Sequence, residues 1–267
     1  EATRVNGAAL VHVDGLKDEL VVVGTDAPIN GESVFAFSMD GSPRWKVNLS
    51  SPRTWPDCTE PGYWNCRAVS VGDLDGAAGD EIVVAGSEIR QYGSRISIIN
   101  PKSGTLVRTF WHLGHIEGLR IVPKFLDKDR PAILAWGRNN KLDGFELPEN
   151  NDAPAQTCWN IVGVVMILDP DDMEGVGPPR TRRLPDLEEA RPYAYGFLDA
   201  PASSGDGCRD DTGVAPRKPA VTEVASIRGA NIGPYPATDG TGPWFAVAVG
   251  SHENGIGVEF KLDRHLD

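Results

Sequence analysis

The sequence predicts an all-β fold made of repeated four-stranded units, and three observations lead to this prediction. Apolar residues occur in runs of four to eight that are bounded by Gly, Pro, Asn and Asp, as in strands joined by turns. Helical periodicity is scarce, and only residues 184–190 are expected to form a short helix. The apolar runs recur in a fixed order, roughly 50 residues apart, which predicts a β-propeller of about four to five four-stranded blades in a single domain, residues 1–267.

The first two units show the clearest order of strands. In each, an apolar strand leads to an acidic turn, a second and a third apolar strand, a Gly-containing hairpin turn and a fourth strand. The first unit covers residues 7–50, with strands expected at residues 8–13, 20–24, 33–37 and 44–47. The second unit covers residues 67–112, with strands expected at residues 67–71, 82–86, 95–99 and 106–110.

Two further units match the pattern less well. The third covers residues 117–184, with strands expected at residues 119–125, 132–137 and 164–169. The fourth covers residues 219–263, with strands expected at residues 220–227, 244–250 and 257–262. Residues 139–158 and 170–219 do not fit the repeat, so they are predicted to be long loop insertions, or else to conceal a degenerate blade. A β-sandwich with similar hairpins is the alternative fold.

The second strand of every unit ends in glycine, at Gly24, Gly86, Gly137 and Gly250. Tightly packed inner strands near a propeller axis favour a residue without Cβ. We therefore expect a close approach between neighbouring strands at these positions.

One turn in the second unit carries the most specific chemistry. From Gly72 to Glu81 it reads Gly-Asp-Leu-Asp-Gly-Ala-Ala-Gly-Asp-Glu, and it runs directly into an apolar strand. Acidic side chains at alternate positions bring oxygen ligands toward one hard cation such as Ca²⁺. Weaker copies of the turn occur near residues 14–19 and 127–129, where the shortened acidic pattern predicts no ion.

With this turn and the strand after it, the chain resembles the FG-GAP/VCBS repeat family, whose blades also occur in integrin α-subunit propellers. The resemblance is strongest over residues 69–86 and weaker over residues 11–24, 121–137 and the last unit. It extends over roughly two-thirds of the chain. It implies a propeller fold and calcium-binding turns, and it indicates little about function.

The resemblance also implies a set of calcium ligands. In the family's loops, acidic oxygens come from the first, third, fifth and ninth positions, and a backbone carbonyl comes from the seventh. Here these positions imply Asp73, Asp75 and Glu81 as side-chain ligands and Gly79 as the carbonyl ligand. The fifth position is Ala77, which has no ligand atom, so weaker binding is expected. One calcium ion is thus the expected cofactor, and the alternative is an ion-free turn held by hydrogen bonds.

The four cysteines lie in polar, turn-rich segments. An even number of cysteines in loops predicts two disulfides, most simply Cys58–Cys66 and Cys158–Cys208. Such disulfides would place the protein in a secreted, extracellular or cell-surface setting. Free buried thiols are the alternative. A zinc site is disfavoured because the chain has no C-x-x-C motif and no histidine near any cysteine.

The charge and the lengths of the apolar runs argue against a nucleic-acid partner and against a membrane-spanning helix. The formal net charge is −12, from 38 acidic and 26 basic residues, which disfavours nucleic acid. No apolar run approaches the roughly 20 residues of a membrane-spanning helix, so no membrane span is expected. Because the chain starts at Glu1 rather than Met, it is interpreted as a processed form or an excised domain.

Three aromatic residues surround the predicted Cys58–Cys66 loop: Trp55, Tyr63 and Trp64. Exposed rings in such a loop would stack on sugar or anchor a protein partner. The alternative is that they pack over the edge of a blade.

The motifs favour a binding role over catalysis, since the chain has no nucleophile elbow and no phosphate-binding glycine loop. We predict an extracellular, non-catalytic binding or adhesion propeller that presents its loops to a protein or glycan partner. Two alternatives stay open. One is a polysaccharide-active enzyme (hydrolase or lyase) or its accessory domain. The other is a structural module of a larger surface assembly, in which the chain would also bind copies of itself.

Overall fold

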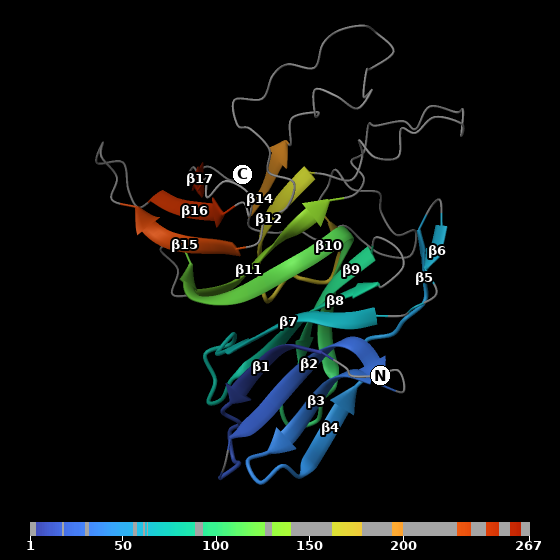
Figure 1. Cartoon of the computed structure of the whole chain (residues 1–267). Helices are drawn as coiled ribbons and strands as arrows, with labels where there is room; N and C mark the ends of the chain where they lie inside the picture. The colour runs from blue at the N-terminus through green and yellow to red at the C-terminus, as the bar shows by residue number, and fades with distance from the viewer. Residues whose placement is uncertain are drawn as a thin grey trace, which may run out of the picture.

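The computed structural model describes residues 4–17, 19–29, 32–55, 58–60, 62, 64–88, 93–125, 130–139, 162–177, 194–199, 229–235, 244–250 and 257–262. Every regular element in these ranges is a strand, and neighbouring strands pair antiparallel with one exception given below, so the predicted all-β fold of propeller type is confirmed (Figure 1). Within this part of the chain, no helix has the length and apolar character needed to cross a membrane. The helix predicted at residues 184–190 lies outside the described ranges.

The first sheet, here called blade 1, is a four-stranded meander in chain order. Its strands are β1 (Val5–Val11), β2 (Leu20–Ile29), β3 (Glu32–Ser38) and β4 (Pro43–Val47). The turn between β3 and β4 follows from its sequence, because Gly41 adopts a φ of 84° and the Asp40 carboxylate accepts a hydrogen bond from the Ser42 backbone N–H at 2.9 Å.

The second meander, blade 2, follows a short hairpin that the sequence pattern did not predict. The hairpin strands are β5 (Arg53–Trp55) and β6 (Cys58–Glu60). Blade 2 consists of β7 (Trp64–Gly72), β8 (Glu81–Glu88), β9 (Gly93–Ile99) and the first part of β10 (Leu106–Phe125).

Strand β10 differs from the prediction, which had separate strands at residues 106–110 and 119–125. It is one strand of 20 residues that pairs with β9 from Leu106 to Leu113 and with the next strand from Gly114 to Phe125. No Pro, Asn or Asp interrupts residues 111–118, so nothing there forces a turn. The same strand therefore closes blade 2 and opens blade 3.

Blade 3 continues from β10 through β11 (Arg130–Asn139), β12 (Val162–Leu168) and β14 (Ala194–Asp199). Strand β13 (Gly175–Gly177) pairs in parallel with β10. Both β13 and β14 lie within residues 170–219, so this predicted insertion supplies strands as well as loops. The pairing of β14 with β12 explains why, since it completes the blade.

The last described sheet has three strands, β15 (Gly229–Tyr235), β16 (Trp244–Gly250) and β17 (Gly257–Leu262). The strand expected at residues 220–227 lies outside the described ranges, and β15 is the strand that pairs with β16. The number of blades and their boundaries stay a prediction.

Strand β8 is buried on both faces and separates two cores. Ile82 and Val84 face the core shared with blade 1, whereas Val83 and Ala85 face the core shared with blade 3. This division follows directly from the two-residue period of a strand. It also explains why β8 reads as a continuous apolar run.

The expected close approach is confirmed at Gly24, Gly86 and Gly137, and it stays a prediction at Gly250. A Cβ on Gly24 would lie 2.5 Å from the Cys66 Sγ, across the contact between blades 1 and 2. A Cβ on Gly86 would lie 3.2 Å from Leu49 Cδ1, and one on Gly137 would overlap the carbonyl oxygen of His115.

Candidate cation-binding turn

The acidic turn joins β7 to β8, and its own side chains hold its backbone. The Asp73 carboxylate oxygen Oδ1 accepts hydrogen bonds from the N–H groups of Asp75 at 3.2 Å and Gly76 at 2.6 Å. The Asp75 Oδ1 accepts one from the Ala77 N–H at 2.8 Å. Gly76 has a φ of 76°, a left-handed conformation that glycine adopts without strain. These hydrogen bonds and Gly76 hold the turn in a tight conformation by themselves.

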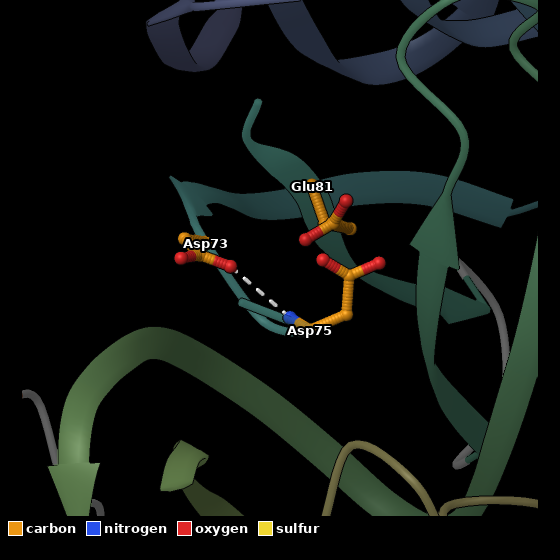
Figure 2. A group of neighbouring side chains, drawn as sticks. All are labelled: Asp73, Asp75 and Glu81. Atoms are coloured by element: carbon orange, nitrogen blue, oxygen red, sulfur yellow. Dashed lines mark hydrogen bonds between the residues drawn. The ribbon is translucent and has the colours of Figure 1, made fainter. Parts of the chain in front are cut away.

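Three carboxylates converge within this turn. Ligand oxygens of Asp73, Asp75 and Glu81 all lie within 4.8 Å of one another. Figure 2 shows the Asp75 and Glu81 carboxylates pointing toward each other, with Asp73 across the turn. The two aspartates are exposed and the glutamate is half-buried. The structure therefore brings together the three side chains that the sequence predicted as ligands.

The pKa of Glu81 is shifted by its position in this acidic cluster. Partial burial raises the pKa of its carboxyl, and the negative charges of Asp75, Asp73 and Asp80 raise it further. A hydrogen bond of 2.9 Å from the Leu74 N–H to Glu81 Oε2 acts in the opposite direction. A bound cation would relieve the repulsion among these carboxylates.

The donor set fits a hard cation only in part. Three carboxylates suit Ca²⁺, which takes 6–8 oxygens, but Ala77 has no ligand atom at the remaining acidic position. Gly79, predicted to offer its carbonyl, has a φ of 124° and lies against blade 1, where a Cβ would come 3.2 Å from the Asp14 backbone nitrogen. Its role as a ligand stays a prediction. Water would have to complete the coordination shell.

The turn also connects blades 1 and 2. The Asp80 N–H donates to the His12 carbonyl at 2.8 Å, and the His12 N–H donates to the Asp80 Oδ2 at 2.9 Å. These reciprocal hydrogen bonds join the end of β1 to the residue before β8. A cation bound in the turn would lie beside these hydrogen bonds and would therefore affect how firmly blade 1 is held against blade 2.

The predicted Cys58–Cys66 disulfide is wrong in this structure, where Cys66 is a free thiol. Cys66 points into the core between blades 1 and 2, with no exposed surface, and its Sγ lies 3.5 Å from the Ala68 carbonyl oxygen that accepts its hydrogen bond. Burial raises the pKa of this thiol to about 12. Cys66 belongs to β7 rather than to a loop, which is why the loop argument failed. Cys158 and Cys208 lie outside the described residues.

The predicted exposed aromatic cluster also needs correction. Trp64 is completely buried, its indole N–H donates to the Ser51 carbonyl at 3.1 Å, and its ring forms an edge contact with Trp111. It is the first residue of β7, so the strand turns it into the core. The Trp55 side chain and Tyr63 lie outside the described part of the structure.

Sequence reasoning missed several buried polar side chains beside this core, among them Glu88 on β8, His112 on β10 and the guanidinium of Arg95. Arg95 lies on β9 and is 4% exposed. The signal was present in the sequence as an arginine at the start of the apolar run Arg95 to Ile99.

Comparisons with known proteins leave the family open. No family model matches the chain, and no curated protein matches it. Among solved structures, it is similar to the Dos1 propeller, with 9% identity and a TM-score of 0.48, covering 92% of this chain and 42% of that one. It is also similar to the rhamnogalacturonan lyase PL11 of Bacillus licheniformis, with 14% identity and a TM-score of 0.35, covering 94% of this chain and 44% of that one. The chain thus spans less than half the length of either protein, and its fold assignment rests on its own sheet topology.

Proposed function

We propose that this chain is an extracellular, non-catalytic binding or adhesion propeller of the FG-GAP/VCBS type, stabilised by one Ca²⁺ ion at the Asp73–Glu81 turn. Its loops would be presented to a protein or glycan partner. The observation that carries the proposal is the convergence of three carboxylates in a turn that also contacts the neighbouring blade.

The hydrogen bonds of the turn support binding of a cation. In each of the three carboxylates, one oxygen already accepts a backbone N–H of the turn, which fixes the side chain. Because the side chains are already held in place, binding an ion would cost little further side-chain freedom. Preorganisation of this kind strengthens binding.

The position of the turn supports a scaffolding role for the ion. Because Asp80 and Gly79 of this turn contact blade 1, an ion held by Asp73, Asp75 and Glu81 would stiffen the blade 1–blade 2 contact. Loops carried on rigid sheets are the usual location of binding residues. The ion would thus support recognition without taking part in chemistry.

Thermal unfolding with Ca²⁺ or with a chelator tests the proposal. A ligand at 100 times its Kd stabilises by about 2.7 kcal/mol, which raises the Tm of a domain of this size by about 5 to 10 °C. We expect such a rise for the wild-type chain. The Asp73→Ala/Glu81→Ala double variant should lose most of it.

A matched control is available at Asp40→Ala. Asp40 is also an exposed turn aspartate that accepts a backbone N–H, at Ser42, yet it has no carboxylate cluster around it in the described structure. This variant should keep the full response to Ca²⁺. An equal response in the double variant and the control would show that the ion binds elsewhere.

The binding role needs a separate measurement. The wild-type chain should bind a member of a panel of polysaccharides and extracellular matrix proteins without releasing shortened or unsaturated products. Such products would replace the binding role with a polysaccharide-active enzyme. Failure to bind any member with Ca²⁺ present would count against recognition by the chain itself.

A further inference from the structure

One face of blade 1, here called the outer face, is apolar and belongs to neither of the two cores. The strand register sets its residues side by side in two rows across the sheet. One row is Ala8, Val23, Phe35 and Lys46, and the other is Leu10, Val21 and Phe37. All of them except Lys46 are apolar, and none lies in the cores that join blades 1, 2 and 3.

The outer face is accessible in the described structure. Leu10 is 53% exposed, and the four residues at the centre of the face are partly exposed. On the opposite face of the same strands, Val22 and Ala36 are fully buried in the core shared with blade 2. In Figure 1, blade 1 forms one end of the described structure, with blade 2 on one side of it. A single exposed apolar side chain is ordinary, but a contiguous apolar patch marks an interaction surface.

The repeat shows what covers the same face in blade 2. Strands β2 and β8 are equivalent, because each runs from an acidic turn to a glycine, and three residues before that glycine Val21 corresponds to Val83. Val21 pairs with Phe37 on β3, just as Val83 pairs with Ile98 on β9. Val83 and Ile98 lie in the core shared with blade 3. The outer face of blade 1 is therefore the counterpart of the blade 2 face on which blade 3 packs.

The chemistry of the two faces also corresponds. Phe35 of blade 1 takes the place of Ile96, another residue of the core shared with blade 3. Lys46, the one charged residue of the outer face, stands where blade 2 has Phe110. It lies on β4, the edge strand of the sheet, so the centre of the face carries no charge. Such a face suits the apolar face of another β-blade.

We propose that the outer face is the interface of a reversible two-fold dimer, in which blade 1 of a second copy takes the place that blade 3 takes on blade 2. The outer face itself meets the requirements for this partner, since it is apolar at its centre and charged only at its edge. Each copy supplies the blade that the other lacks. A two-fold arrangement uses the same face on both copies, so the dimer closes and does not grow further.

The size of the face sets the expected strength. Four strands about 4.8 Å apart, with seven residues at about 3.3 Å each in β1 and β3, give a face of roughly 19 by 23 Å. This projected area is smaller than the roughly 800 Å² that each partner buries in a standard interface. We therefore expect a dimer that dissociates on dilution.

Sedimentation velocity of the full chain, in chelator at neutral pH, tests the proposal. Over protein concentrations from about 1 μM to about 1 mM, where weak interfaces dissociate, the mass should rise from that of a monomer to that of a dimer. The Asp73→Ala/Glu81→Ala variant should dimerise like the wild type. This result would separate the dimer from the proposed calcium site, because either can fail without the other.

A matched pair of variants locates the interface. Leu10→Glu places a charge on the outer face and should weaken the dimer by about tenfold or more, since the charge would be buried there. Val107→Glu makes the same change on β10 at a residue that is 52% exposed, against 53% for Leu10, and should leave the dimer unchanged. Leu10→Ser is the milder variant should Leu10→Glu fail to fold, and it should weaken the dimer less.

Two results would overturn the proposal. A monomer at every concentration would leave the outer face to a further blade of a longer chain or to another protein. A dimer that Leu10→Glu and Val107→Glu affect equally would use a different surface.

Discussion

At the scale of single residues, Glu81 makes the stability of the protein depend on pH and on cations. Its carboxyl is half-buried beside three other acids, and its pKa is raised above the ordinary value. A raised carboxyl pKa means that the folded state binds a proton more readily than the unfolded state. Without a cation, stability therefore increases as the pH falls through the raised pKa, and it decreases again as the pH returns to neutral.

Calcium should reverse this dependence, because the ion binds the ionised carboxylates. We expect the Tm of the chelated protein to rise modestly on mild acidification, and the Tm increment given by Ca²⁺ to shrink over the same range. In Glu81→Gln, the chelated protein should lose the rise that comes from this group. Tm measured against pH, with and without Ca²⁺, checks the prediction, and a calcium increment that persists at low pH would contradict it.

Cys66 gives a second prediction at this scale. With no exposed surface and a pKa of about 12, its thiol should react with alkylating reagents only after unfolding. Alkylation under native conditions, followed by alkylation with a second reagent in denaturant and peptide mapping, separates the two states. The second reagent should label Cys66. A Cys58–Cys66 disulfide in the peptide map would restore the sequence-based expectation.

At the scale of elements, the sequence pattern predicted most of the strands of blades 1 and 2, because their apolar runs are bounded by Gly, Asp and Asn. The acidic turn was equally visible, since its residues are adjacent in the chain. Strand β10 was missed because one strand serves two blades, and no local signal marks the change of partner. Strand β14 was missed because its partner β12 is distant in sequence.

At the scale of elements too, the packing of blade 1 against blade 2 leaves no room for a side chain at Gly24 on β2. An added Cβ would lie 2.5 Å from the Cys66 Sγ and 2.9 Å from Val69 Cγ2 on β7. We expect Gly24→Ala to destabilise the fold by about 1–3 kcal/mol, the usual effect of overpacking. Urea unfolding measures the change.

A double-mutant cycle distinguishes this clash from a general loss of stability. Cys66→Ala alone removes a buried side chain and should destabilise, but combined with Gly24→Ala it removes the overlapping atom. The double variant should therefore be more stable than the sum of the two single changes predicts. Strict additivity would mean that Gly24 is not in contact with Cys66.

At the scale of the whole molecule, the blades are joined by apolar cores on both faces of blade 2 and by polar contacts at the acidic turn. Composition and periodicity predicted this layered β architecture. They did not predict which residues face inward at the strand ends, so Trp64 and Cys66 were assigned to a loop. Arg95 was missed for a related reason, because its burial depends on which neighbours the sheet brings around it.

The most direct test of the central claim is a crystal structure grown with Ca²⁺, inspected between Asp73, Asp75 and Glu81. The account predicts an ion there with oxygen ligands at about 2.3–2.6 Å, including all three carboxylates and water at the position left by Ala77. Water alone between these carboxylates, at a calcium concentration that stabilises the protein, would contradict the account.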